Sequence, residues 1–291
     1  MKLSVVLATR NEEKNIGECL KSVKDIAGEI IVVDEESSDK TREIAESYGA
    51  KVTTVKHEPI FHKTKQKAIE KAMGDWIFQI DADERVSSNL AREINEVVNS
   101  SNEELVNRVL WSMSSKKHSL FSRHQHLIEQ REGKLGHPTG EVVAFFVPRR
   151  NIFLGKPLIY GGVYPDGVIR LIKNGKARLP AKSVHELMEI DGEVGWLVND
   201  LEHHDSPTLE RYLERNNRYT DLIAKDLKKE GVSVNYWNFF VYSFIKPTMV
   251  FLSLYLRHKG ILDGMRGFIW SMFSALRFPV AYFKYWQNEK I

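Results

Sequence analysis

Short apolar runs alternate with longer segments of helical spacing over the first hundred residues of the chain. The apolar runs are rich in valine and isoleucine, and the segments between them repeat apolar residues every three or four positions. Strands joined by helices of this length favour right-handed βαβ units and a parallel sheet, so an α/β fold is predicted. The predicted strands are 2–8, 29–33, 51–55 and 76–80, and the predicted helices are 11–24, 38–48, 64–72 and 89–98.

The pattern changes beyond about residue 108, where the apolar segments become shorter and are broken by glycine and proline. The runs 142–147 and 168–172 predict strands of a mixed, partly antiparallel second half. A charged helix is predicted over 209–230, and an aromatic, basic segment follows it. We therefore expect one domain over residues 1–205, with halves 1–107 and 108–205, and a helical region over 206–291.

The chain of 291 residues has a single cysteine, Cys19. This excludes an internal disulfide framework and a cysteine-rich zinc site, and it fits a reducing compartment. No secretory signal is expected, because the apolar run 3–8 is too short and Arg10 follows it. These features predict a cytoplasmic protein.

The predicted strand 76–80 runs directly into Asp81, Asp83 and Glu84, with Ala82 between the two aspartates. Closely spaced carboxylates repel one another and are costly to hold near a core. A divalent cation removes this repulsion, and Mg²⁺ takes oxygen ligands that it often shares with substrate phosphates. Because open α/β sheets bind ligands at the carboxyl ends of their strands, the turn predicts a metal site. A solvated acidic turn is the alternative.

Polar residues also follow the first and second predicted strands, at 9–13 and 34–41. Neither segment contains the Gly-x-Gly-x-x-Gly pattern or a P-loop, which argues against dinucleotide binding and NTP hydrolysis. Carboxylates at these strand ends can instead hold hydroxyls and base edges, while a metal neutralises phosphate charge. Such a site suits a nucleoside diphosphate with a sugar attached.

These strand ends, read as Val5–Glu13, Ile30–Thr41 and Asp81–Glu84, resemble glycosyltransferase family 2. Later motifs resemble those of bacterial lipopolysaccharide core β-1,4-glucosyltransferases. The resemblance implies a GT-A fold, a nucleotide-diphospho-sugar transferase sandwich with a mostly parallel central sheet, extended here by C-terminal amphipathic helices. It also implies transfer with inversion, with the nucleotide sugar bound by 1–107 and the acceptor by 108–205. The later motifs are Gly161–Asp166, Arg170-Leu171, Val184-His185-Glu186, Tyr212 and Asn216–Thr220.

The resemblance also implies roles for individual residues. Asp34 would hold the uracil or the ribose, and Asp83 would be the direct ligand of Mg²⁺ or Mn²⁺. Lys63 would approach the base or the diphosphate, although a solvated lysine at a helix start is an equal alternative. The predicted nucleotide-sugar-binding residues are Thr9, Arg10, Asn11, Glu12, Asp34, Lys63, Gln66, Asp81 and Ala82.

The general base must be a carboxylate that takes the proton of the acceptor hydroxyl as it attacks the anomeric carbon. Many members of the family use the aspartate of a Glu-Asp pair, with Arg-Leu further on. This chain departs from that pattern, because Pro165 precedes Asp166 and the Arg-Leu pair at Arg170 follows at a shorter spacing. Asp166 is the predicted base, and Glu186, after His185 at the end of another apolar segment, is the alternative.

Three further residues have two interpretations each. Arg170 is predicted to orient the base or the diphosphate through its rigid guanidinium, and an ion pair with a surface acid is the alternative. His203 or His204 could complete the metal shell or approach the β-phosphate, and a structural histidine is the alternative. The predicted catalytic residues are Asp166, Glu186 and Arg170, and the predicted metal ligands are Asp83, Asp81 and His203.

Residues 231–291 contain seven lysines and arginines against two acids, and 16 of the 30 aromatic residues. Because Lys246-Pro247 and later charges interrupt the apolar runs, none is expected to span a bilayer. Amphipathic helices with aromatic and basic residues suit the headgroup region. We expect peripheral attachment at the inner face of the cytoplasmic membrane, next to a glycolipid acceptor. Packing on the catalytic domain or a homodimer is the alternative use of these helices.

The leading interpretation is an inverting, metal-dependent glycosyltransferase that moves a hexose, glucose being favoured, from a UDP-sugar to lipopolysaccharide core or a similar glycolipid or saccharide acceptor. A nucleotidyltransferase is the first alternative, but the segment 9–13 lacks the glycines of such enzymes. The second is a non-catalytic protein that binds sugar nucleotides or glycans. Nucleic-acid binding is not expected, because the basic residues gather among apolar aromatics rather than on a polar face.

Overall fold

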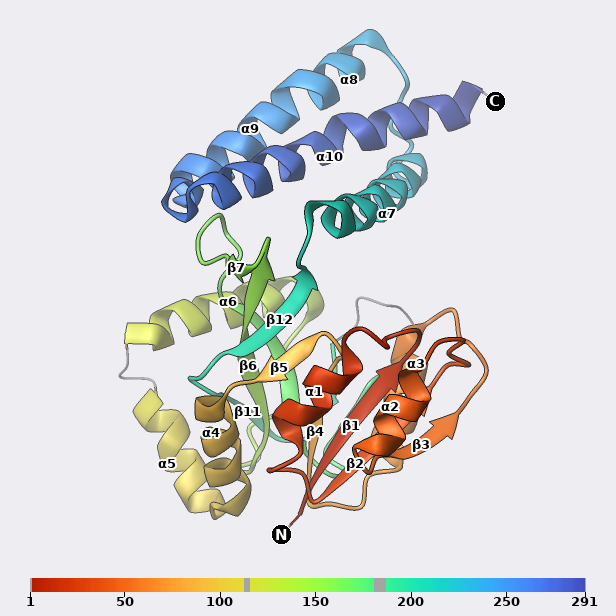
Figure 1. The fold of residues 1–291 in the computed structure, drawn as a ribbon. Helices are drawn as coiled ribbons and strands as arrows, with labels where there is room; N and C mark the ends of the chain where they lie inside the picture. Colours follow the sequence, from red (N-terminus) through yellow and green to blue (C-terminus); the bar gives the residue numbers. More distant parts are fainter. Residues whose placement is uncertain (1, 113–115, 181–186, 291) are drawn as a thin grey trace. The chain divides into compact units, whose positions relative to one another are not determined.

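The structure is a computed structural model that describes residues 2–112, 116–180 and 187–290, and the chain divides into two compact units (Figure 1). Unit 1 consists of Met1–Arg149 and Pro165–His203, and unit 2 consists of Arg150–Tyr164 and His204–Ile291. The chain passes from one unit to the other within strand β6 (Val142–Phe153), between Tyr164 and Pro165, and within strand β12 (Leu201–Ser206). The domain boundary expected after residue 205 stays a prediction.

Four parallel strands form the first half of the sheet in unit 1. Strand β1 (Leu3–Thr9) lies between β2 (Glu29–Asp34) and β4 (Trp76–Gln79), and β3 (Lys51–Thr54) pairs with the far side of β2. The register places Thr9 directly opposite Asp34. The polar segments that follow β1 and β2 therefore leave the sheet side by side, as the parallel arrangement requires.

Alternate residues of these strands enter two separate hydrophobic cores. Val5 and Leu7 belong to one core, and Val6 belongs to the other. Because helices cover both faces, the strands read as continuous apolar runs. The first core includes residues of α1 (Ile16–Val23), α2 (Thr41–Ser47) and α4 (Ser88–Asn99), and the second includes residues of α3 (Phe61–Glu70) and α6 (Lys116–Glu132).

Three helices begin three residues or more from the positions that the periodicity predicts. Helix α1 starts at Ile16 rather than at residue 11, because Asn11 has a left-handed φ of 55°, which a helix does not accommodate. Helix α2 starts at Thr41 rather than at residue 38, and helix α3 starts at Phe61 rather than at residue 64. All three differences lie at the ends of elements whose type is as predicted.

The second half of the sheet is mixed, as the shorter apolar runs predict. Among the described residues, ten strands form one sheet in the order β3-β2-β1-β4-β8-β6-β12-β5, with β7 and β11 paired to β6. Strand β8 is antiparallel to both β4 and β6, and β5 is antiparallel to β12. The predicted α/β fold with flanking helices is confirmed. The remaining elements of unit 1 and its borders are β5 (Glu84–Val86), α5 (Asn102–Ser112), β6 (Val142–Phe153), β8 (Asp166–Lys173), β9 (Ala177–Arg178), β10 (Glu189–Ile190), β11 (Glu193–Trp196) and β12 (Leu201–Ser206).

Unit 2 contains the predicted C-terminal helices. Helix α7 (Leu209–Lys229) begins at its cap residue Thr208, whose side chain accepts a hydrogen bond from the Arg211 amide, and Gly231 follows it with φ 64°. Helix α10 (Met265–Lys290) packs along α7 and along the helical run before it. Short β7 (Lys156–Pro157) and the turn η3 (Gly260–Asp263) complete the unit.

The expectation that Lys246-Pro247 breaks the apolar tail is wrong. The segments α8 (Tyr236–Phe240), η1 (Val241–Ile245), α9 (Lys246–Leu252) and η2 (Ser253–Arg257) form one uninterrupted helical run. Proline normally clashes with the carbonyl four residues earlier, and the wider π-helical turns of η1 precede it here. By length and composition alone the run Tyr236–Arg257 could cross a membrane, a property that core helices and signal sequences share.

Candidate active site

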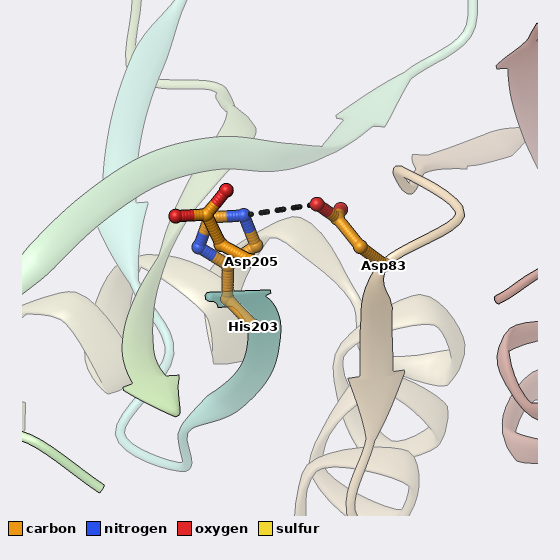
Figure 2. A group of neighbouring side chains, drawn as sticks. All are labelled: Asp83, His203 and Asp205. Carbon is orange, nitrogen blue, oxygen red and sulfur yellow. Dashed lines mark ion pairs between the residues drawn. The ribbon is translucent and has the colours of Figure 1, made fainter. Parts of the chain in front are cut away.

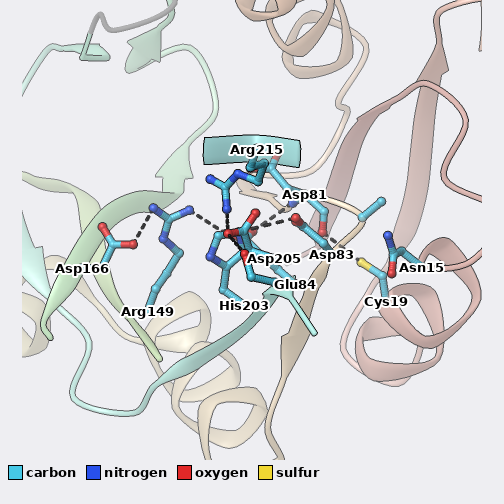
Figure 3. Close-up of polar contacts among 12 residues, drawn as sticks. Asn15, Cys19, Asp81, Asp83, Glu84, Arg149, Asp166, His203, Asp205 and Arg215 are labelled. Carbon is cyan, nitrogen blue, oxygen red and sulfur yellow. Dashed lines mark hydrogen bonds and ion pairs between the residues drawn. The ribbon is translucent and has the colours of Figure 1, made fainter. Parts of the chain in front are cut away.

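The acidic turn after β4 lies at the centre of a network of buried charges in unit 1 (Figure 3). The backbone amide of Glu84 donates to the carbonyl of Asp81 (2.9 Å), and the Asp81 amide donates back to the Glu84 carboxylate (2.9 Å). This reciprocal pair fixes the turn, and it places the carboxylate of Glu84 inside the protein with no exposed area. The three acids of the turn therefore have different environments.

Asp81 is held between two cations. Its carboxylate lies 2.5 Å from Nη2 of Arg170 and 2.6 Å from Nζ of Lys65, and it also accepts a hydrogen bond from Gln79 (3.1 Å). Burial alone would raise the pKa of Asp81, but the charges of Arg170 and Lys65 outweigh burial and hold its pKa well below the usual range. Asp81 is therefore a carboxylate already neutralised by protein side chains.

Arg170 is the cation that connects the network. It is buried on β8, and its Nη2 also contacts the Glu84 carboxylate at 2.6 Å, while Nη1 donates to Gln79. Burial opposes the charge, but the carboxylates of Asp81 and Glu84 raise the pKa of Arg170, so it stays protonated. The alternative of a surface ion pair is excluded by this burial.

Asp83 faces a different partner. Its carboxylate lies 3.5 Å from Nε2 of His203 on β12, and the two side chains retain 28% and 11% of their surface (Figure 2). Burial works against ionisation of Asp83, but the hydrogen bond and charge of His203 lower its pKa. Carboxylate oxygen and imidazole nitrogen are both metal ligands, so this pair fits a divalent cation.

The boundary between the two units falls just after His203 on β12. Asp205 follows His203 by two positions on this strand, so strand alternation places both side chains on one face (Figure 2). Within unit 2, Asp205 forms an ion pair with Arg215 (Figure 3). The charge of Asp205 is thus balanced by Arg215.

The predicted base Asp166 is linked to the same network through Arg149. Nη2 of Arg149 lies 2.7 Å from Asp166, and Nη1 lies 3.5 Å from the buried Glu84 (Figure 3). The next residue, Gly167, donates its amide to Nε2 of His124 on α6 (3.1 Å). Burial lowers the pKa of His124, which keeps its ring neutral and able to accept this bond. Asp166 is therefore positioned from both sides while 32% of its side chain stays exposed.

The segments after β1 and β2 bind each other closely. Thr9 donates to Asp34 (2.9 Å), and Asn11 accepts from the Ser38 amide (2.9 Å). The amide of Glu12 donates to the Thr41 hydroxyl (2.7 Å). Asp34 is completely buried, so these contacts bring the predicted nucleotide-pocket residues together in one rigid corner.

A second chain of contacts begins at Arg10. Its Nη1 lies 2.9 Å from Nε2 of His57, and Nδ1 of His57 lies 2.7 Å from the buried Glu35. Because arginine can only donate, Nε2 of His57 accepts and Nδ1 carries the hydrogen that reaches Glu35. Thr64 also donates to Glu35. Neither Glu35 nor His57 is among the residues predicted from the sequence.

Lys63 and Gln66 point to other partners than the acidic turn. Lys63 pairs with Glu58 at 3.3 Å, and Gln66 accepts the Leu179 amide at 2.8 Å. Lys65, between them, reaches Asp81 instead. The signal was present in the helical spacing, because Lys65 occupies a position of the apolar face shared with Phe61 and Ala68.

Ala82 and Glu186 are the remaining residues that were predicted for the site. Ala82 is buried, and its carbonyl accepts a hydrogen bond from Arg85 (2.7 Å). Glu186, the alternative base, lies outside the described residues, as does His185. Arg149, His124 and Lys65 are site residues that the sequence analysis missed.

Comparison with known proteins identifies relatives over most of the chain. The family model "Glycosyl transferase family 2" matches residues 4–153. A Rickettsia felis protein described as an uncharacterized glycosyltransferase is 28% identical over 290 residues, covering 94% of this chain and 86% of the relative. The lipopolysaccharide core biosynthesis glycosyltransferase LpsC of Rhizobium meliloti is 26% identical over 280 residues, covering 94% and 88%.

Solved structures also match. Glucosyl-3-phosphoglycerate synthase from Mycobacterium tuberculosis, solved with Mn²⁺, UDP-glucose and phosphoglyceric acid, is 29% identical to this chain over the aligned part. The alignment covers 28% of this chain and 34% of the solved chain, with a TM-score of 0.27.

Proposed function

The chain belongs to glycosyltransferase family 2, and from that premise we propose that it is an inverting, metal-dependent enzyme. It would transfer a hexose, glucose being favoured, from a UDP-sugar to a cell-surface glycolipid or polysaccharide such as lipopolysaccharide core. The observation that carries the proposal is that the two aspartates of the acidic turn have different partners. Asp81 is neutralised by Lys65 and Arg170, whereas Asp83 faces His203.

Asp83 and His203 are the residues that would hold the cation. A donor set of one carboxylate and one imidazole suits Mn²⁺ better than Mg²⁺, which prefers oxygen ligands alone. When bound, the metal would stabilise the negative charge that develops on the diphosphate leaving group. Asp81 was predicted as a second ligand, and its two cation partners favour a role at the ribose or diphosphate instead.

The protein's own residues would supply the rest of the chemistry. Lys65 and Arg170 bring two positive charges to the edge of the turn, where the diphosphate of the donor would lie. Asp166, fixed by Arg149, would take the proton of the acceptor hydroxyl as the glycosidic bond forms. The corner formed by Thr9, Arg10, Asn11, Glu12 and Asp34 would hold the nucleoside, and residues 108–205 would contact the acceptor.

The acceptor and the C-terminal helices suggest where the enzyme works. In unit 2, Trp237, Phe240, Phe244 and Met249 leave 48% to 67% of their surfaces exposed. Lys246 lies near the middle of the run Tyr236–Arg257, and a charge at the bilayer centre costs about 2.5–3.5 kcal/mol. We therefore propose attachment to the surface of the inner face of the cytoplasmic membrane rather than a span.

A ligand titration tests the proposed donor and metal. UDP-glucose with Mn²⁺ should stabilise the wild type by about 2.7 kcal/mol at a hundredfold excess over its Kd, measured as a thermal shift. Asp83→Asn should lose the metal-dependent part of this shift. Asp25→Asn, which removes the same charge from an exposed site in unit 1, is the matched control. No shift with UDP ligands in any combination would refute the proposal.

Vesicle sedimentation tests the membrane attachment. The wild type should bind vesicles that contain phosphatidylglycerol at low salt and bind less at high salt. Phe240→Glu with Phe244→Glu should weaken this binding, and Met73→Glu, a similarly exposed apolar site in unit 1, should not. If instead the paired variant only changes the elution volume in size exclusion, the apolar face is a homodimer contact.

A further inference from the structure

The motif on helix α7 has no role in the proposed sugar transfer. Tyr212, Asn216 and Tyr219 follow one another at helical spacing, so they lie on one face of α7. Tyr212 and Asn216 are buried. All three side chains lie around one residue of α10, Arg277, within unit 2.

Arg277 is positioned by these neighbours. Its Nε donates to the side-chain oxygen of Asn216. Its guanidinium carbon lies 5.3 Å from the ring centroid of Tyr219 and 5.8 Å from that of Trp270. Stacking on two rings and a bond to Nε leave the two terminal nitrogens of the fork available.

Arg277 has no carboxylate partner among the described residues. The neighbouring cations of unit 2 do have one: Lys284 pairs with Asp221 at 2.5 Å, and Arg215 pairs with Asp205. Arg277 is only partly exposed, and a partly buried charge is costly unless it is paired. The described part of the structure therefore contains a fixed positive charge that has a neutral acceptor, Asn216, but no anion beside it.

Two hydroxyl groups beside Arg277 also lack partners. Tyr212 and Ser274 are 3% and 8% exposed, and neither hydroxyl oxygen forms a hydrogen bond of normal geometry with a described residue. Burial raises the pKa of Tyr212, and the charge of Arg277, together with side-chain contacts from Ser274 and Arg277, opposes that rise, so the phenol stays protonated as a donor close to the other two groups. Buried hydroxyls without a partner are uncommon in native structures.

We propose that Arg277, together with the hydroxyls of Tyr212 and Ser274, binds a phosphate group. The cluster offers one fixed charge and several donors, and a phosphate offers negative charge and several acceptor oxygens in the geometry that guanidinium groups recognise. The phosphate can belong to a phospholipid headgroup or to a free phosphate-containing ligand. The site lies wholly in unit 2, and the proposal does not depend on sugar transfer.

The first test uses inorganic phosphate as the probe. The full-length protein is titrated in EDTA at constant ionic strength, and the thermal shift gives an apparent Kd. Arg277→Gln should weaken phosphate binding about tenfold, because hydrogen bonds to charged groups are among the strongest. Arg218→Gln removes the same charge from an exposed position of α7 and should leave the Kd unchanged.

A second pair of variants separates binding from packing. Tyr212→Phe and Ser274→Ala remove the unpartnered hydroxyls and keep the guanidinium, so they should fold even if Arg277→Gln does not. Each should weaken phosphate binding severalfold. If Arg277 only joins α10 to α7, these two variants will bind phosphate as the wild type does, and the proposal is overturned.

Vesicle binding then distinguishes the two sources of phosphate. If the ligand is a lipid headgroup, Arg277→Gln should bind vesicles containing phosphatidylglycerol several times more weakly than Arg218→Gln does. Equal vesicle binding by the two variants, with the inorganic phosphate effect still lost in Arg277→Gln, assigns the site to a free phosphate ligand. Equal behaviour in both assays would overturn the phosphate site.

Discussion

Arg170 in unit 1 and Arg277 in unit 2 are both held by neighbouring side chains, but these neighbours differ in chemical type. Arg170 lies between Asp81 and Glu84, and a glutamine fills its remaining contact. Arg277 lies between two aromatic rings and an asparagine, with no carboxylate among the described residues. Acids of the protein itself balance the charge of Arg170, whereas the charge of Arg277 is left for the phosphate that we propose as its ligand.

The largest expected effect is on stability, and it comes from Arg170. Arg170→Met should destabilise the protein by about 3–5 kcal/mol, because the buried carboxylates of Asp81 and Glu84 lose their counter-charge. Urea unfolding at neutral pH measures this change. Arg277→Gln, which leaves no acid unpaired, should cost much less. A similar loss for both variants would erase the distinction between the two arginines.

Glu29 is a carboxylate of unit 1 that two neutral donors and one cation hold together. It accepts hydrogen bonds from the Ser4 hydroxyl (2.6 Å) and the Met73 amide (2.8 Å) and pairs with Lys51. Burial opposes ionisation, but these bonds lower the pKa of Glu29 from 4.5 to about 2. Such a shift corresponds to about 3 kcal/mol.

The sign of this effect follows from the lowered pKa. Stability from Glu29 is fully present above about pH 4.5 and is lost as the pH falls toward 2. Glu29→Gln should therefore be less stable than the wild type at pH 7, and the difference should shrink steadily below pH 4.5. Urea unfolding across this pH range measures it, and a difference that does not depend on pH would contradict the account.

Asp166 tests whether a carboxylate paired with an arginine can still act as the general base that removes the proton of the acceptor hydroxyl. Asp166→Asn should lower the rate of sugar transfer about a hundredfold, the usual contribution of a general base, with little change in the melting temperature. UDP release in the presence of acceptor measures the rate. Retained turnover in Asp166→Asn together with its loss in Glu186→Gln would move the base to residue 186.

Lys65 should have the smallest effect of this series. Lys65→Gln leaves Asp81 with Arg170 alone and should reduce transfer about tenfold, because one of the two charges near the leaving group is gone. Lys63→Gln is the matched control, since Lys63 pairs with Glu58. If the control falls as far as Lys65→Gln, the helix start as a whole binds the donor.

Much of unit 1 could be predicted because its determinants are local. The strands around Val5 and Ile31 are apolar on both faces, as buried parallel strands must be, and the acidic turn follows β4 as the sequence indicates. Periodicity did not predict the starts of α1, α2 and α3. The left-handed Asn11, for example, donates its amide to the Ser37 hydroxyl of another segment.

The acidic residues of the candidate site were predicted from the sequence, whereas its basic residues Lys65 and Arg149 were not. Carboxylates clustered at a strand end can be recognised in the sequence as a candidate site, because burying them together is costly unless a positive charge compensates them. No sequence pattern of this kind indicates a site role for Lys65 or Arg149, since a single basic residue usually lies in solvent. Lys65 reaches Asp81 from helix α3, and Arg149 reaches Asp166 from strand β6, where the register pairs these two residues directly.

The sequence by itself determined the alternation of strands and helices, the acidic turn after residue 80, and the membership of a family whose motifs lie at strand ends. The tertiary structure alone decided which cation meets which carboxylate, that Pro247 is accommodated within a helical run, and that none of the described acids lies beside Arg277. Local patterns follow from backbone geometry and burial, which short segments encode. Charge pairing depends on side chains brought together across the fold, and only the packed chain fixes those distances.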